Sequence, residues 1–380
     1  MDFYLDYAAT HPVETRFILN QILKEERMNP SSTHSLGIES KNAYDKSIKN
    51  ICNRLGVSEI TITSGATEAN NLAVKIGVQY CKESKEFTGI ACSDFEHPSL
   101  HNSIHEYSKD TVLYEYYFNS DMFFGKDWKK RLRKTLQIYH IGFLSVMTVN
   151  NETGVRYPVE EIYKICKSLG VLFHTDASQS WLKLNFYDEK LFMATISGHK
   201  IGTTIGEGLL IGGKNVCKRT PSILVGGNQQ ELRSGTLNYL AARELEYAIV
   251  MGTYKKASNL KFVEEYRNKF ITLIKKYGGE IITQENCQNY SPCIICFYFK
   301  DYDGEFIQKF FSKNNVYISA GSACSRGNQE GSRVIKNMGY SEEISKNVLR
   351  VSFSPYMGIE LLKEVYIAFK EVLKKLNELS

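Results

Sequence analysis

Two residues of opposite charge follow two apolar segments in the middle of the chain. Asp176 ends the run VLFHTD, and Lys200 ends the run FMATISGHK. A lysine amine can form a Schiff base with an aldehyde, and a carboxylate beside a pyridine nitrogen keeps it protonated, so that the ring accepts electrons. Pyridoxal 5'-phosphate (PLP) chemistry needs both groups. The stretch from His174 to Lys200 is therefore a candidate PLP site, although neither residue is diagnostic alone.

A turn of small residues could hold a phosphate. The sequence Ser64-Gly65-Ala66-Thr67-Glu68 follows a predicted strand, 59–63, and precedes a helix predicted from Ala69. The start of a helix exposes unpaired N–H groups at the positive end of the helix dipole, a geometry that binds phosphate. The turn lacks the GxxxxGK[ST] pattern of a P-loop. Taken alone, it fits an ordinary capped helix at least as well.

Apolar strand-like runs alternate with amphipathic helical runs in the first half of the chain. For example, the continuous apolar run 141–149 is typical of a buried parallel strand and is followed by a helical pattern over 159–170. This alternation predicts an α/β fold, with a mostly parallel central sheet and helices on both faces. Ligands of such sheets bind beyond the carboxyl ends of the strands. The predicted strand ends carry Thr67, His97, Asn151, Asp176, Gln179, Ser197, His199 and Lys200.

The pattern changes from about Ala257, where a long charged helix leads into short strands and a final amphipathic helix. A chain of 380 residues is longer than one compact core usually spans, so we expect two domains. The predicted division is a large PLP-binding α/β domain over 13–256. Residues 1–12 and 257–380 are expected to form a smaller α+β domain.

Composition excludes several classes of protein. With 43% hydrophobic residues, 23% charged residues and a net charge of +5, the chain is an ordinary globular protein, and direct nucleic-acid binding is not expected. The basic cluster within 129–134 is expected to be a solvated helix face. The chain shows neither a signal-peptide pattern nor an apolar run long enough to cross a membrane, so we expect a cytoplasmic protein.

Histidine and cysteine spacings do not predict a metal site. His97, His101 and His105 could share a helix face, but no further ligand joins them, and we expect only His97 to be functional. The nine cysteines are scattered and odd in number, which favours reduced thiols. Cys293 and Cys296 form a lone CxxC, which cannot complete a tetrahedral zinc site, and they are expected to be buried strand residues.

Many separated motifs together resemble the PLP-dependent cysteine desulfurases of the NifS/IscS type, within the class V aminotransferase family. In order, they are LDYAAT, NPSSTH, TSGATEANNLAVK, EHPS, VNNETGV, HTDASQS, SGHK, GGNQQELRSGT, GSACS and LRVSFS. They extend over essentially the whole chain, and their order makes them more specific than any one motif. The resemblance implies a fold-type I PLP-dependent transferase, normally a homodimer. It also implies the conversion of L-cysteine to L-alanine, with sulfur retained as an enzyme-bound persulfide.

The resemblance also assigns roles to residues around the cofactor. Lys200 would bind the cofactor aldehyde, Asp176 would hold the pyridinium N–H, and Gln179 would contact the phenolic oxygen. His97 would stack on the ring and shuttle protons. The residues that would bind the phosphate are Ala66, Thr67, Ser197 and His199, with Thr236 reaching the phosphate of the partner subunit's cofactor.

Three further residues would act on the substrate. Asn151 and Arg350 match groups that orient the ring oxygen and the substrate carboxylate, which a permanently charged guanidinium can grip through both oxygens. Cys324 matches the nucleophile that takes the sulfur. It lies in a segment of small residues in the smaller domain, where a movable loop could carry the persulfide to an acceptor protein of unknown identity.

Three departures from the family pattern leave alternatives open. The segment IGTTIGEG follows the lysine where relatives commonly have a Pro-Lys-Gly element, and His11 replaces a usual threonine. The chain also stops soon after its last predicted helix, without the extension that housekeeping members use to dock an iron–sulfur scaffold. The acceptor could therefore serve iron–sulfur cluster biogenesis, tRNA thiolation or cofactor thiolation. A selenocysteine lyase or another class V PLP enzyme is the alternative, and a non-catalytic PLP-fold binding protein is a further one.

Overall fold

The computed structural model describes residues 2–13, 20, 24, 28–109, 113–180, 191–218, 222, 224–227, 232–282, 289–321 and 331–379. The chain divides into two compact units, which are treated separately. Unit 1 comprises Met1–His11, Val149–Tyr157 and Thr253–Ser380, and unit 2 comprises Pro12–Thr148 and Pro158–Gly252. The domain bounds predicted from the sequence are 13–256 for the large domain and 1–12 with 257–380 for the small one. They stay a prediction.

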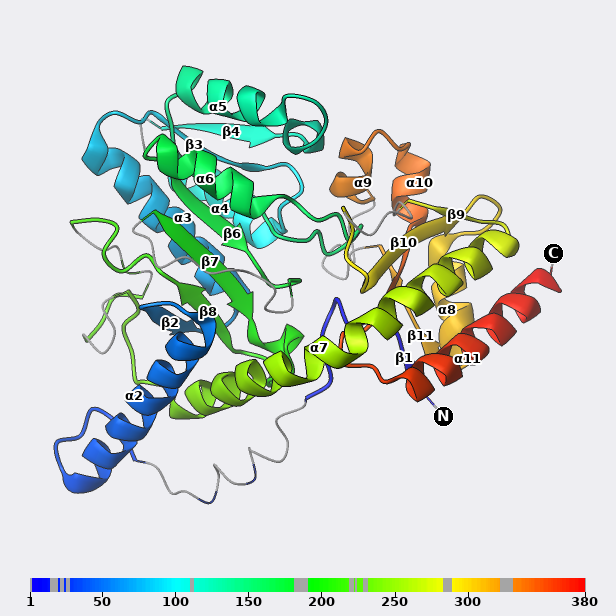
Figure 1. Ribbon diagram of the computed structural model, residues 1–380, viewed down its shortest axis with the longest axis horizontal. Coiled ribbons are helices and arrows are strands. Elements are labelled where there is room, and N and C mark those ends of the chain that lie inside the picture. The colour runs from blue at the N-terminus through cyan, green and yellow to red at the C-terminus, as the bar shows by residue number, and fades with distance from the viewer. Residues whose placement is uncertain are drawn as a thin grey trace. The chain divides into compact units, whose positions relative to one another are not determined.

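Unit 2 is built on a seven-stranded sheet (Figure 1). Its strands, in spatial order, are β2 (Ile60–Thr63), β8 (Gly208–Ile211), β7 (Phe192–Ser197), β6 (Leu172–Asp176), β5 (Ile141–Ser145), β3 (Gly89–Ser93) and β4 (Tyr114–Phe118). Strands β7, β6, β5, β3 and β4 pair in parallel, and β8 is antiparallel to both of its neighbours. All strands of this sheet except β8 therefore share one direction, which confirms the predicted mostly parallel sheet.

Helices cover both faces of this sheet because its strands are apolar on both sides. On one face, α3 (Ala66–Ser84) and α4 (Pro98–Ser108) pack over residues such as Leu172 and Met193. On the other face, Tyr163 of α6 (Val159–Ser168) contacts the rings of Phe173 and Phe192. Neighbouring residues of a strand point to opposite faces, so β6 and β7 serve both layers. The other helices among the described residues of this unit are α2 (Ser35–Leu55), η1 (Ser120–Phe123), α5 (Trp128–Ile138), η2 (Gly198–Lys200) and the first part of α7 (Tyr239–Lys276).

Three element bounds differ from the sequence-based expectation. Helix α3 begins at Ala66 rather than Ala69, and strand β5 ends at Ser145 rather than Val149. Helix α7 runs without interruption from Tyr239 to Lys276, so the pattern change near Ala257 is not the start of a new helix. Gly252 does not break α7, because one glycine costs a helix only about 1 kcal/mol. The sequence pattern of residues 13–28 also predicts a helix, and these residues lie largely outside the described ranges.

Unit 1 contains a four-stranded antiparallel sheet and a small parallel pair. The sheet order is β12 (Ser319–Ala320), β13 (Leu349–Ser352), β10 (Ile294–Phe299) and β9 (Gly279–Ile281). Strand β1 (Phe3–Tyr4) pairs in parallel with β11 (Val316–Tyr317), so the first residues pack against the C-terminal part of the chain. The helices of this unit, besides the end of α7, are α8 (Gly304–Lys313), α9 (Arg333–Asn337), α10 (Glu342–Asn347) and α11 (Ile359–Asn377).

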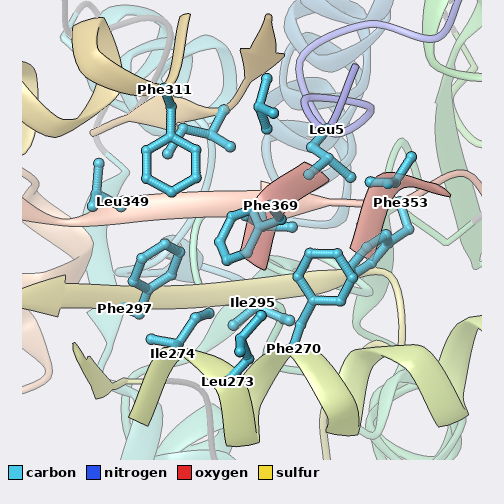
Figure 2. Packing of buried hydrophobic residues seen from close by; sticks show 14 of the residues in the cluster. Leu5, Phe270, Leu273, Ile274, Ile295, Phe297, Phe311, Leu349, Phe353 and Phe369 are labelled. Carbon is cyan, nitrogen blue, oxygen red and sulfur yellow. The ribbon is translucent and has the colours of Figure 1, made fainter. Parts of the chain in front are cut away.

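The core of unit 1 lies between this sheet and the long helices. Figure 2 shows Phe270 of α7, Phe297 of β10 and Phe369 of α11 converging in one buried cluster. Cys293 belongs to this cluster, whereas Cys296 packs in a second cluster on the other face of β10. Both cysteines are buried, as predicted, and they face opposite sides of the strand. This arrangement does not allow them to bind one metal ion together.

We expect Phe369→Ala to lower the free energy of unfolding by about 3–5 kcal/mol, because a fully buried ring leaves a cavity. Its ring centroid lies 4.9 Å from those of both Phe270 and Phe311. The control is Ile367→Ala on the same helix, where the side chain is 60% exposed. Urea unfolding followed by circular dichroism measures both. Equal midpoints for the two variants would contradict this location of the core.

Candidate active site

Three predicted site residues lie together at the carboxyl ends of neighbouring strands in unit 2. Asp176 is the last residue of β6, Lys200 ends the short turn η2 after β7, and His97 follows β3 as the N-cap of α4. Burial has the largest effect on the pKa of both Asp176 and His97, and the charge of Lys200 lowers both values. The sheet therefore assembles the aspartate, the lysine and the histidine as the parallel topology predicts.

Asp176 is a buried carboxylate with defined partners. The backbone N–H of Ser178 donates to its Oδ1 over 2.9 Å, and Asn70 Nδ2 donates to its Oδ2 over 2.8 Å. Burial alone would raise the pKa of Asp176, but the Lys200 charge and these hydrogen bonds hold it below its usual value. Asp176 is therefore ionised at neutral pH. A buried anion of this kind suits the protonated nitrogen of a pyridine ring.

Lys200 lies in the connection between the antiparallel strands β7 and β8. Ser197 pairs with Gly208 in the ladder, and the N–H of Gly198 donates to the backbone oxygen of Glu207 over 2.9 Å. The backbone thus closes the turn that presents Lys200. The unusual segment IGTTIGEG forms this turn and the start of β8.

Two glutamates hold the segment after Lys200. Thr204 donates to Glu244 Oε2 from its backbone N–H over 2.8 Å and from its hydroxyl over 3.0 Å. Glu207 is buried nearby, and burial together with the charge of Glu244 raises the pKa of Glu207 to about 8. Glu207 is therefore mainly protonated at neutral pH. The segment IGTTIGEG thus places one buried carboxyl, Glu207, close to Glu244 of α7.

The start of α3 has the features expected of a phosphate site. The helix begins at Ala66 after Gly65, whose φ of 145° favours glycine, and no side chain caps this end. A Cβ atom at Gly208 would lie 2.6 Å from the backbone carbon of Gly65, so β8 passes close to this turn. Thr67 is exposed at the same end. Uncapped N–H groups at a helix start fit an anion.

The other residues predicted for the cofactor occupy two kinds of environment. Ser197 and Gln179 are buried next to the ends of β7 and β6. His199 is half-buried, and burial followed by the Lys200 charge lowers its pKa to about 4. Thr236 is exposed in the segment before α7. Its predicted role toward a partner subunit stays a prediction.

Arg350 and Asn151 belong to unit 1. Arg350 is buried on β13, where Nη1 donates to the backbone oxygen of Asn151 over 2.7 Å and Nη2 donates to Asp6 Oδ1 over 2.6 Å. A guanidinium has five N–H donors, so these two bonds orient Arg350 and leave it further donors for a carboxylate. His11 is also buried, with Nε2 2.9 Å from Ser354 Oγ and its ring against Tyr7. His11 therefore packs within unit 1.

Several predictions concern single residues. Cys324 lies outside the described residues, so its role stays a prediction. His101 stacks on Tyr117 and His105 lies 3.0 Å from Glu115, as expected for surface residues of α4. Within the described ranges, histidine, cysteine and acidic side chains form no cluster that could hold a metal ion. No helix among them is long and apolar enough to span a membrane.

Sequence reasoning missed two polar groups beside the site. Asn70 connects Asp176 to Ser99, and Ser99 in turn lies 2.8 Å from His97 Nδ1. A second group of hydrogen bonds involves His174, two residues before Asp176 on β6. The His174 ring lies within hydrogen-bond distance of the hydroxyls of Ser145 and Thr195. The i, i+2 spacing of His174 and Asp176 indicates a shared face of β6. An asparagine inside a helical pattern gave no comparable signal.

The fold and the site together define the class of protein. A mostly parallel α/β sheet, with a lysine and a buried ionised aspartate at its carboxyl edge, is the architecture of the fold-type I PLP-dependent transferases. This finding confirms the predicted fold class.

Comparison with known proteins places the chain more closely. Residues 3–365 match the family described as Aminotransferase class-V. A relative, the mitosomal cysteine desulfurase of Trachipleistophora hominis, is 30% identical over 391 residues, covering 99% of this chain and 87% of its own. A solved NifS-like protein is 27% identical with a TM-score of 0.84, covering 99% of this chain and 100% of its own. SspA in complex with cysteine is 25% identical with a TM-score of 0.76, over 94% and 100%. The chain belongs to the aminotransferase class-V family.

The buried ring of His174 predicts a pH dependence of stability. Burial lowers the pKa of His174 from 6.5 to about 4, although Asp176 opposes this shift. As the pH falls below 6.5, the unfolded chain binds a proton that the folded chain excludes, so stability from neutral His174 is lost toward pH 4. The stability advantage of the wild type over His174→Gln should therefore shrink between about pH 7 and pH 5.

Urea midpoints at the two pH values measure this difference. The exposed His105, changed to Gln, is the matched control and should show no such decrease. A wild-type advantage over His174→Gln that stays constant with pH would be evidence against a neutral, buried His174.

Proposed function

We propose that this protein is a PLP-dependent cysteine desulfurase that converts L-cysteine to L-alanine and retains the sulfur as a persulfide on Cys324. The single observation that carries the proposal is the ionised Asp176 buried beside Lys200. The similarity over 99% of the chain to a protein named cysteine desulfurase supports the choice of reaction. The cysteine complex of SspA, a structural relative, supports cysteine as the substrate.

The residues present fit PLP. Asp176 would hold the pyridine nitrogen, Lys200 would bind the aldehyde carbon, and Gln179 would contact the phenolic oxygen. When bound, PLP supplies an electron-accepting ring that stabilises negative charge at the substrate α-carbon. The uncapped start of α3 supports a phosphate site. The residues proposed for the phosphate are Ala66, Thr67, Ser197 and His199, with Thr236 acting in a partner subunit.

The remaining steps are assigned to this chain's own groups. Lys200, once released by the incoming substrate amine, would take the proton from the α-carbon. Arg350 would bind the substrate carboxylate, and Asn151 would help to orient the cofactor. The Cys324 thiolate would then bond to the substrate sulfur while the carbon–sulfur bond breaks. The electrons of that bond would stay with the β-carbon, which gains a proton, and the α-carbon would regain a proton from Lys200, so that alanine leaves.

The proposal extends to the protein's partners. We expect a homodimer, since the phosphate role of Thr236 needs a second subunit. The persulfide would pass to an acceptor protein for iron–sulfur cluster biogenesis, tRNA thiolation or cofactor thiolation. A cytoplasmic location is proposed from the sequence alone.

Lys200→Ala should lose the visible absorbance band of lysine-bound PLP, because the Schiff base between the cofactor aldehyde and the Lys200 amine can no longer form. The measurement is the absorbance spectrum of the purified protein after incubation with PLP. Lys214→Ala is the matched control, since this lysine lies in the loop after β8, and it should keep the band. An unchanged band in Lys200→Ala would remove the lysine from the proposed site.

Cys324→Ser should keep the visible band but release sulfide from cysteine at least about 100-fold more slowly, because a hydroxyl cannot form the persulfide. Alanine and sulfide are measured with a thiol reductant present. Cys217→Ser, at a buried thiol in unit 2, is the control for general thiol loss. Full activity of Cys324→Ser with cysteine would contradict the persulfide route. Activity of that variant with selenocysteine alone would favour a selenocysteine lyase.

Arg350→Lys should raise the KM for cysteine about 10- to 100-fold, since an ammonium cannot reproduce the two-pronged grip on a carboxylate. Lysine keeps the positive charge that pairs with Asp6, so the variant is expected to stay folded. Arg156→Lys, at an exposed position of unit 1, is the control. If KM stays unchanged in a folded Arg350→Lys protein, the substrate carboxylate binds elsewhere.

A further inference from the structure

A chain of four polar side chains leads from Asp176 to His97 inside unit 2. Asn70 Nδ2 lies 2.8 Å from Asp176 Oδ2 and 2.9 Å from Ser99 Oγ. Ser99 Oγ lies 2.8 Å from His97 Nδ1. The residues come from β6, α3 and the start of α4, and Asn70 is completely buried. The aspartate proposed for the cofactor nitrogen is thus connected to the histidine proposed for the cofactor ring.

The Asp176 end fixes the direction of the first bonds. An ionised carboxylate only accepts hydrogen bonds, so the Asn70 amide must turn its NH2 group toward Asp176. The opposite amide orientation would bring two acceptors together. The same NH2 group reaches Ser99, so its second hydrogen is donated to Ser99 Oγ. Ser99 therefore accepts from Asn70 and has one hydroxyl proton left to donate.

The His97 end receives that proton. The Ser99 hydroxyl donates to His97 Nδ1, and the Ser99 backbone N–H, 3.2 Å away, also points at this nitrogen. His97 is the N-cap of α4 and accepts the N–H as a capping group does. If Nδ1 carried a hydrogen, that hydrogen and the hydrogen of the Ser99 N–H would point at each other and repel. Nδ1 must therefore be the unprotonated nitrogen of the ring.

His97 is also neutral. Burial, followed by the positive charge of Lys200, lowers its pKa to about 4, and the opposing effect of Asp176 is smaller. A neutral imidazole with an unprotonated Nδ1 carries its single proton on Nε2. The geometry and the charge state agree on one tautomer.

We propose that Asn70 and Ser99 are positioning residues that hold His97 as the neutral Nε2–H tautomer, so that the resting enzyme presents it as a hydrogen-bond donor. Its one lone pair is engaged at Nδ1 and is not available as a base. Lys200 is then the group that takes the substrate's α-proton, and His97 orients or polarises an acceptor through Nε2. This assignment states which nitrogen of His97 carries the proton in the resting enzyme. It rests on the proposed function for its catalytic meaning, but the tautomer does not depend on turnover.

The test is nitrogen-15 NMR of the full-length, PLP-loaded protein labelled at histidine. Long-range proton–nitrogen correlations distinguish a protonated from an unprotonated ring nitrogen, and the His97 signals are those lost in His97→Gln. We expect an unprotonated Nδ1 and a protonated Nε2 throughout about pH 6–8. A protonated Nδ1 in the wild-type protein would falsify the proposal.

Variants test whether the chain of hydrogen bonds is the cause. Asn70→Ala and Ser99→Ala each remove a link, and each should give mixed tautomers at His97 and about a tenfold lower kcat with little change in KM. Asn71→Ala is the matched control, because Asn71 is the next residue on α3 and its amide donates to the backbone oxygens of Thr67 and Ser99. It should keep the wild-type His97 signals.

The outcomes separate this inference from the proposed function. A protein with the Nε2–H tautomer but no desulfurase activity would overturn the reaction and retain the positioning chain. An active enzyme whose His97 signals are unaffected by both variants would overturn the positioning role. If Asn70→Ala fails to fold, Ser99→Ala alone decides, since it removes one hydroxyl from a half-buried position.

Discussion

A buried negative charge governs the architecture of unit 2. An isolated carboxylate removed from water is destabilised by several kcal/mol, so Asp176 can remain ionised only where other parts of the chain supply charge and donors. Lys200 supplies the charge from the turn after β7, Asn70 supplies a donor from α3, and Ser178 supplies one from the backbone just beyond β6. The parallel sheet brings these otherwise distant segments to one edge. The same edge is where the cofactor is proposed to bind.

The chemistry is divided between local and long-range structure. The Asp176 carboxylate, proposed to hold the cofactor nitrogen, is positioned by its own strand and turn, and Lys200 is positioned by the β7–β8 connection. The histidine is contacted across two helices, because Ser99 of α4 lies 2.8 Å from His97 Nδ1 and Asn70 of α3 donates to Ser99. A ring held on one side by donors has less freedom than a surface histidine. The site is thus more rigid than its loop positions alone would indicate.

The sequence contained much of this arrangement, but not all of it. Asp176 and Lys200 could be found because each ends an apolar run in a sheet whose alternating pattern is easily recognised. Asn70 could not, because an asparagine within a helix resembles a surface residue until the strand beside it is known. The continuity of α7 through residue 257 was hidden by a change in composition that the backbone does not follow. The roles of Cys324 and Thr236 came from the family resemblance, because the local sequence pattern alone does not assign them.

The turn that presents Lys200 has an evolutionary consequence. Its closure depends on the ladder between β7 and β8 and on a main-chain bond from Gly198 to the carbonyl of Glu207. Main-chain groups are the same for almost every amino acid, so the side chains after the lysine can diverge without displacing it. Glu207 lies in this tolerant segment, and Glu244 of α7 accepts hydrogen bonds from Thr204 of the same segment. Substitutions in this segment can therefore change the charge next to Lys200, while the backbone that presents the lysine stays in place.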